Sequence, residues 1–329
     1  MFSRHCKQRA PLRKRRVFLR ERRPRRDGIG ENSRRAGAPP TAAVTLLLLL
    51  LPGALQAAPV TVIDSRGATI SLPAPAGRIV ALAPHLAENL FAAGGGKRLV
   101  GTVEYSDHPA AARAVPRIGG YNSLSLEAIV ARRPDLVLAW GSGNGAAIVE
   151  RLESLGIAVY VDEIRDLGSI SGTLTDLGRL AGSTKHGAAA AKRLAQGFAD
   201  LGPPPGSRRL RVFYQLWHDP MQTVGGSHLI SAVIERCGGE NLFAELPSLA
   251  PRVGRESVLA RAPEVIIASG AEKETPPWLA DWRRFPQLPA VARDTLYGLN
   301  PDLIQRPTPR LLDGARVVCA LLAEARARY

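Results

Sequence analysis

The chain has 329 residues, enough for two domains that each bury a core. Its formal net charge of +15 would suit a nucleic-acid binder, but residues 1–57 hold 14 of the 44 basic residues and only 3 of the 29 acidic ones. The remaining residues are nearly balanced, with 30 basic and 26 acidic side chains, so the composition argues against nucleic-acid binding.

The first 57 residues predict an export signal behind a basic, disordered leader. An apolar run at 41–51 ends in six leucines, follows Arg34 and Arg35, and is broken by Pro52 and Gly53. The run is too short to span a bilayer but suits the core of a signal peptide. We expect cleavage after Ala57 and a periplasmic mature protein, with a retained N-terminal anchor as the alternative.

Strand and helix patterns alternate from residue 60 onward. Residues 60–64 and 69–72 flank a Ser-Arg-Gly turn and predict a hairpin. Continuous apolar strands that alternate with helices indicate a mostly parallel sheet covered on both faces. The predicted strands are 78–83, 99–103, 136–140 and 157–161, and the predicted helices are 85–93, 126–132 and 146–155.

Two consecutive helices then interrupt the alternation, at 170–181 and 185–201. The pattern resumes with strands at 210–216, 265–269 and 295–299 and helices at 228–237 and 310–327. The sequence therefore predicts an α/β fold of two Rossmann-like lobes joined by one long connecting helix. The expected parts are the leader and signal peptide (1–57), an N-terminal lobe (58–182), a connecting helix and linker (183–207) and a C-terminal lobe (208–329).

An internal repeat supports this plan. Residues 125–141 align without gaps on residues 254–270, and both copies are a short helix, a proline that stops it and a buried strand that ends in glycine. Chance similarity in an alanine-rich chain is the alternative. Two similar lobes would form a ligand cleft outside the carboxyl ends of their strands.

Two cysteines remain once the leader, with Cys6, is removed. Cys237 and Cys319 are then the only pair in an oxidising compartment, so a disulfide between them is expected. Two buried free thiols are the alternative.

Catalytic and metal-binding signatures are missing from the sequence. It contains neither G-x-S-x-G nor H-E-x-x-H, and its glycine-rich loops lack the spacing of a nucleotide-binding loop. No pair of histidines outside the leader has metal-ligand spacing on one helix, so these residues are expected at the surface or as helix caps. They are His85, His108, His186, His218 and His228. We expect no metal site, no cofactor and no enzyme, with an α/β enzyme acting in the cleft as the competing class.

Several aromatic and polar side chains follow predicted strands. Tyr105, Tyr121, Trp140 and Trp217 do so, and broad rings lining a cleft suit a large, flat, partly apolar ligand. Core packing explains Trp217 equally well. Asp302 and Arg306 could add hydrogen bonds to the ligand or form a plain surface ion pair.

Six segments together resemble one known family over residues 75–325. They are RIVALAPHLAENLFAAG, VEYSDHP, SLEAIVARRPDLVLAW, VIERCGGENLF, GRESVLARAPEVII and NPDLIQRPTPRLLDGARVVCALL. The chain is similar to the periplasmic vitamin B12-binding proteins of bacterial ABC importers. The resemblance implies limited hinge motion and a disulfide at the positions of Cys237 and Cys319.

The resemblance also implies roles for single residues. Tyr105, Tyr121 and Trp140 match aromatic cobalamin contacts, with Tyr121 in place of a tryptophan. Trp217 lies near another such contact in a poorly aligned loop, and Ala250 stands where a tryptophan is expected. Asp302 and Arg306 match groups that reach the corrin amides. Glu127 and Glu256 match the glutamates that dock on the permease, with solvated first-turn acids as the alternative.

The sequence thus predicts a periplasmic receptor that captures cobalamin or a related corrinoid as a transported ligand. Its partners would be the importer's permease dimer with its ATPase subunits, and the receptor itself would be a monomer. A haem or ferric-siderophore receptor is the alternative. With haem, His85, Tyr105 or Tyr121 could serve as an axial ligand.

Overall fold

The computed structural model describes residues 58–120, 122–270 and 275–329. The predicted leader, the signal peptide and the cleavage position after Ala57 lie outside the described residues, and so does Tyr121. The predicted hairpin is confirmed, with β1 (Val60–Ile63) antiparallel to β2 (Thr69–Leu72). Within the described part of the chain, no helix has the length and apolar character needed to cross a membrane.

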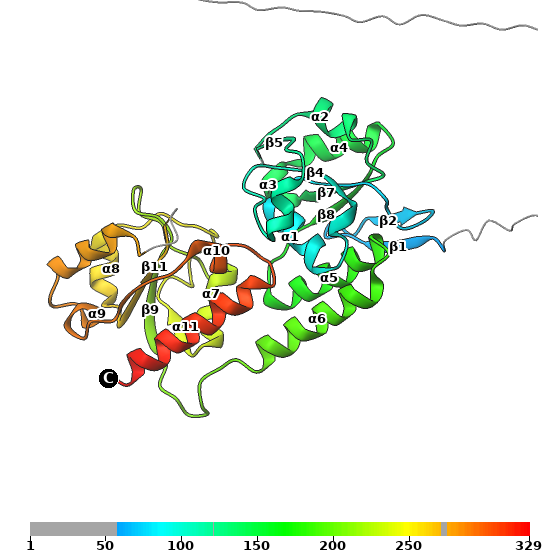
Figure 1. The fold of residues 1–329 in the computed structure, drawn as a ribbon. Coiled ribbons are helices and arrows are strands. Elements are labelled where there is room, and N and C mark those ends of the chain that lie inside the picture. Colours follow the sequence, from blue (N-terminus) through cyan, green and yellow to red (C-terminus); the bar gives the residue numbers. More distant parts are fainter. Residues whose placement is uncertain (1–57, 121, 271–274) are drawn as a thin grey trace, which may run out of the picture. The chain divides into compact units, whose positions relative to one another are not determined.

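The first half of the described chain is built on a four-stranded parallel sheet with the order β4-β3-β7-β8 (Figure 1). Its strands are β3 (Ile79–Ala81), β4 (Leu99–Thr102), β7 (Leu136–Trp140) and β8 (Ala158–Asp162). Between them lie α1 (Pro84–Ala92), η1 (Gly96–Arg98), η2 (Ala110–Ala114), α2 (Leu126–Ala131), α3 (Gly141–Asn144), α4 (Ala146–Ser154) and the small hairpin of β5 (Gly119–Gly120) and β6 (Ser123–Leu124). We call this part, residues 60–180, the N-lobe.

The second half is built on another four-stranded parallel sheet, with the order β10-β9-β11-β12. Its strands are β9 (Leu210–Gln215), β10 (Gly239–Asn241), β11 (Val265–Ala268) and β12 (Leu296–Gly298). Its helices are α7 (Leu229–Arg236), α8 (Arg255–Arg261), η3 (Pro277–Arg284), α9 (Pro289–Ala292), α10 (Pro301–Ile304) and α11 (Arg310–Arg326). We call residues 210–326 the C-lobe.

The two sheets have the same topology. In each, the first and second strands in the chain pair with each other, and the third and fourth follow on the other side of the first. The sequence repeat falls on α2 and β7 in the N-lobe and on α8 and β11 in the C-lobe, which are equivalent places. The repeat therefore reflects a duplicated helix–strand unit.

Both faces of each sheet are covered by apolar side chains, as the continuous apolar strands predict. Alternate residues of β7 enter different clusters: Leu136 and Leu138 pack toward α1 and α5, and Val137 and Ala139 pack on the opposite face. The C-lobe behaves likewise, with Ile267 on one face of β11 and Ile266 on the other.

The helices α5 (Leu167–Leu180) and α6 (Thr184–Ala199) follow the N-lobe sheet and pack side by side (Figure 1). Asp166 begins α5 as an N-cap, since its side chain accepts a hydrogen bond from the Ser169 N–H. Gly178 and Gly187 let the two helices approach closely, because a Cβ built on Gly178 would lie 2.8 Å from the Cα of Gly187.

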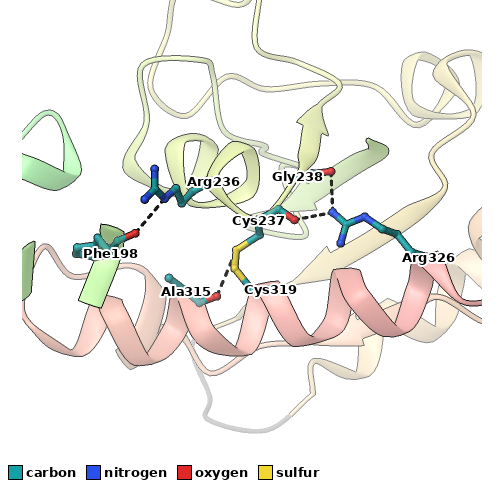
Figure 2. Close-up of a disulfide and its surroundings, with 7 residues drawn as sticks. All are labelled: Phe198, Arg236, Cys237, Gly238, Ala315, Cys319 and Arg326. Carbon is teal, nitrogen blue, oxygen red and sulfur yellow. Dashed lines mark hydrogen bonds between the residues drawn. A yellow bond between two sulfur atoms is a disulfide. The ribbon is translucent and has the colours of Figure 1, made fainter. Parts of the chain in front are cut away.

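The predicted disulfide is confirmed. Cys237, at the end of α7, is bonded to Cys319 in α11, as Figure 2 shows. Arg326 lies about two turns after Cys319 in α11 and donates hydrogen bonds to the carbonyls of Cys237 and Gly238. The last helix is thus attached to the C-lobe sheet through the α7–β10 turn.

Two polar contacts join α1 of the N-lobe to residues 307–310. Arg310 donates two hydrogen bonds to the Glu88 carboxylate, at 2.7 and 2.6 Å, and Glu88 is almost fully buried. Asn89 donates from Nδ2 to the Pro307 carbonyl at 3.0 Å. A bidentate pair of this kind fixes both distance and orientation.

Candidate ligand-binding cavity

A cavity of about 860 Å³ is lined by residues of both lobes. Nearly every lining segment follows the carboxyl end of a strand, which is where open α/β sheets bind ligands. The N-lobe contributes segments after β3, β4, β7 and β8, and the C-lobe contributes residues 227–229 at the start of α7, Gly270 after β11 and most of 301–307 after β12. The position expected for the cleft is therefore where the cavity lies.

Tyr105 lines the cavity with a ring that is 72% exposed. Its backbone is in the left-handed region, with φ 62°, a conformation that costs energy for any residue with a side chain. Arg306 Nη1 donates to the Tyr105 carbonyl at 3.2 Å. A residue of the C-lobe thus helps to hold a strained turn that presents an aromatic ring to the cavity.

Trp140 ends β7 and also lines the cavity. The backbone N–H of Trp140 donates to Asn144 Oδ1 at 2.7 Å, and Asn144 Nδ2 donates to the Leu82 carbonyl at 3.0 Å, which anchors the turn next to the neighbouring strand. The indole lies against Gly143, where an added Cβ would come within 1.9 Å of the ring. A glycine is therefore required at position 143, because any side chain there would collide with the indole of Trp140.

Asp302 and Arg306 lie in and just beyond α10 and line the cavity. Arg306 contacts Asp302 at 3.4 Å and Asp107 of the N-lobe at 3.6 Å, and the side chains of Asp302 and Arg306 are each about one-fifth exposed. The ion pair, which the sequence offered as the alternative to a ligand-binding role, is present, and contact with a ligand stays a prediction. With Glu163 and Arg165, the described part of the lining carries two acidic and two basic side chains.

Two histidines, one from each lobe, line the cavity. His85 follows the first strand of the N-lobe sheet, and His228 precedes α7, after the first strand of the C-lobe sheet. Burial and the positive charge of Arg306 lower the pKa of His85 to about 3, and burial lowers the pKa of His228 to about 4. Both imidazoles are therefore neutral at physiological pH.

The sequence favours surface or capping roles for these histidines, which is half correct. His228 is the N-cap of α7, because its Nδ1 accepts a hydrogen bond from the Ile230 N–H at 3.0 Å. For His85 the prediction is wrong: the residue is only 7% exposed and packs edge-on to Trp140, with ring centroids 5.3 Å apart. Its position directly after a buried strand, in the same segment as the other cavity residues, was the available signal.

Other predicted site residues lie elsewhere. Trp217 is not among the residues that line the cavity; it is 44% exposed, and its Nε1 donates to the Asp219 carbonyl within its own turn. Apolar lining residues that were not predicted from the sequence include Ile164, Pro247 and Leu249. Among the described residues, no group of three His, Cys, Asp or Glu side chains is arranged to hold a metal ion.

Glu127 and Glu256 are exposed in the first turns of α2 and α8, one on each lobe. Hydrogen bonds from its backbone N–H and from the Ser125 hydroxyl lower the pKa of Glu127. Neither carboxylate lines the cavity. Both are accessible at equivalent positions of the duplicated unit.

Fold and cavity together define a two-lobed ligand-binding protein, and known sequences agree. The periplasmic binding protein family matches residues 79–303. A vitamin B12-binding protein of Vibrio cholerae serotype O1 is 36% identical over 255 residues, which are 77% of this chain and 91% of that protein. The chain therefore belongs to the periplasmic binding protein family.

Solved structures show the same fold. The crystal structure of the periplasmic vitamin B12 binding protein BtuF of Vibrio cholerae matches with a TM-score of 0.68 and 34% identity, over 76% of this chain and 98% of that one. The periplasmic heme-binding protein RhuT from Roseiflexus sp. RS-1 matches with a TM-score of 0.67 and 20% identity, again over 76% and 98%, a likeness of fold alone. Family membership implies a periplasmic location and ligand binding.

Proposed function

We propose that the protein captures cobalamin or a related corrinoid in the cavity and delivers it to an ABC-type importer without any bond chemistry. The observation that carries this proposal is the cavity itself: rings from the N-lobe and polar groups from the C-lobe line one large space after the strand ends. Relatives named as vitamin B12-binding proteins cover most of the chain, which supports the same ligand class.

The charges of the lining favour a corrinoid over haem or a ferric siderophore. Among the described lining residues, Glu163 and Asp302 balance Arg165 and Arg306, so this part of the cavity offers no excess of positive charge to a ligand that carries carboxylates. A corrin carries amide side chains, which are neutral and exchange hydrogen bonds with both carboxylates and guanidinium groups. The cavity suits a flat ligand with a polar but uncharged rim.

Titration of the periplasmic protein with cyanocobalamin and, separately, with haemin tests the ligand. We expect one-to-one binding of cyanocobalamin by calorimetry. Trp140→Ala should weaken it by about tenfold or more, since a ring contact contributes on the order of 1–3 kcal/mol. Trp217→Ala is the matched control, because that exposed ring lies outside the lining. A Soret band with haemin and no binding of cyanocobalamin would overturn the proposal.

The proposed partner is the importer's permease dimer with its ATPase subunits, and the proposed docking residues are Glu127 and Glu256. Two equivalent carboxylates on the two lobes suit a two-fold symmetric partner with basic residues. Reversing both charges to Arg should abolish stimulation of the importer's ATPase and leave ligand affinity unchanged. Glu150→Arg with Glu240→Arg, also one exposed acid per lobe, is the control. Undiminished stimulation by the Glu127/Glu256 variant refutes the docking role.

The proposal extends to the mature form of the protein. It includes cleavage after Ala57 and a monomer whose N-terminal lobe (58–182) and C-terminal lobe (208–329) are joined by residues 183–207. N-terminal sequencing of the periplasmic protein checks the cleavage position. Sedimentation checks the monomer, and a dimer at micromolar concentration would contradict it.

A further inference from the structure

The side chain of His85 is buried and faces the cavity. It is 7% exposed, and neither ring nitrogen is hydrogen-bonded to any residue that the structure describes. Buried polar groups in folded proteins are nearly always partnered. An imidazole left without a partner at the wall of a binding cavity is therefore available to a ligand.

The environment of His85 determines the protonation state of the imidazole and the groups with which it can bind a ligand. Trp140 packs edge-on against the ring and restricts its orientation, and the guanidinium of Arg306 disfavours a second positive charge beside it. The imidazole therefore stays neutral, with one N–H and one nitrogen lone pair. A neutral imidazole nitrogen is a common ligand of first-row transition metals.

The second histidine of the cavity is not equivalent. His228 Nδ1 accepts the hydrogen bond that caps α7, so its proton resides on Nε2 and the ring presents a donor to the cavity. Only His85 combines burial, neutrality and an uncommitted lone pair. The two lobes thus place a potential metal ligand and a hydrogen-bond donor at related positions.

We propose that a ring nitrogen of His85 binds the cobalt of a captured corrinoid whose axial position holds water. The nitrogen lone pair forms the new bond, the water leaves, and no electron or proton is transferred. The inference rests on the proposed function, because it takes the corrinoid as the ligand. It adds a selectivity: corrinoids with an exchangeable axial position bind more tightly than those whose axial positions are occupied by cyanide.

The test compares two cobinamides, which lack the nucleotide base, bound to the full-length exported protein. Aquacobinamide should bind at least tenfold more tightly than dicyanocobinamide, and its visible bands should shift as nitrogen replaces water. His85→Gln keeps the ability to form hydrogen bonds but has no imidazole, so both the preference and the shift should disappear. His228→Ala should keep both the preference and the shift.

Electron paramagnetic resonance of the reduced cobalt(II) form identifies the ligand without any variant. We expect a nitrogen triplet on the cobalt signal in protein of natural isotope content, and a doublet when histidine is labelled with ¹⁵N. The splitting should persist in His228→Ala. This readout holds even if His85→Gln does not fold, which its urea unfolding curve would reveal.

The outcomes separate the inference from the function on which it rests. If cyanocobalamin binds but aquacobinamide shows neither a band shift nor a nitrogen splitting, His85 is not a ligand and the function stands. Loss of the splitting in His228→Ala would also overturn the inference. If no corrinoid binds at all, both the function and the inference fail.

Discussion

The N-lobe and the C-lobe share one strand order but are stabilised by different contacts. Helix α5 of the N-lobe packs backbone to backbone against the following helix α6 at Gly178 and Gly187, whereas in the C-lobe a covalent bond joins α7 to α11. Their buried carboxylates differ as well. Each lobe pairs one buried carboxylate with an arginine, Asp64 with Arg66 and Glu264 with Arg208. The N-lobe also buries Asp162, which accepts a hydrogen bond only from a hydroxyl, that of Thr173, among the described side chains. One topology therefore tolerates quite different means of stabilisation.

The contributions to the cavity differ in the same way. Both lobes supply charged groups, Glu163 and Arg165 from the N-lobe and Asp302 and Arg306 from the C-lobe. The N-lobe adds the large rings of Tyr105 and Trp140, whereas the C-lobe adds aliphatic residues such as Leu249. The sheets are alike and the loops after their strands are not. Ligand recognition has been built on the loops of a duplicated scaffold, as is usual for α/β folds.

Removing the disulfide should have the largest effect on the free energy of unfolding, and this effect should be confined to the C-lobe. Replacing Cys237 and Cys319 with Ser should lower the free energy of unfolding by about 4 kcal/mol, since the bridge closes a long loop. Urea unfolding measures the loss, and hydrogen exchange locates it. Equal loss of protection in both lobes would show that the C-lobe does not depend on this bond separately.

Breaking the ion pair between the lobes should cost somewhat less. Arg310→Ala leaves the Glu88 carboxylate buried without its partner, so the free energy of unfolding should fall by about 3 kcal/mol. Arg316→Ala, which removes an exposed pair with Asp313 on the same helix, is the control and should change it little. Similar values for the two variants would contradict a structural role for the Glu88–Arg310 pair.

The unpaired carboxyl of Asp162 should make the N-lobe sensitive to pH. Burial raises the pKa of Asp162 to about 6, above its value in the unfolded chain, so the folded state binds more protons between the two values. This contribution to stability is complete at low pH and is lost as the pH rises to about 6. Asp162→Asn should therefore raise the free energy of unfolding by roughly 2 kcal/mol at pH 8 and hardly at pH 4. An equal gain at both pH values would disprove the titration.

The smallest effect concerns the ring of Trp140. Gly143→Ala should displace the indole and weaken cyanocobalamin binding about tenfold, with little change in stability. Gly172→Ala in α5 is the control, because nothing lies near its added methyl group. Unchanged affinity in Gly143→Ala would mean that the N-lobe rings are less important than the polar C-lobe groups.

Much of the fold could be predicted because strands that are buried on both faces are continuous apolar runs in the sequence. The apolar runs predicted the bounds of β7 and β11 within a residue. β10 was missed because Gly239, Glu240 and Asn241 have low strand propensity. That segment is a strand because β9 offers it an edge with which to pair, a tertiary effect.

The site was partly predictable for the same reason. Tyr105, Trp140, Asp302 and Arg306 were found by their place after strands, and all four line the cavity. Trp217 also follows a strand, but its chain turns back in a short hairpin with Gln222, a local path that strand position alone does not reveal. The burial of His85 was not predicted because it involves packing against Trp140, a residue that is distant in sequence.

Helix α1 carries cavity and anchoring residues within about one turn, because His85, Glu88 and Asn89 are three and four positions apart. The first faces the ligand, and the other two hold residues 307–310. Residues on one rigid helix move together, so a displacement of Glu88 and Asn89 also displaces His85. We therefore expect that a partner which separates Glu88 from Arg310 also moves His85 away from the cavity. Such a movement would couple binding of the partner to release of the ligand.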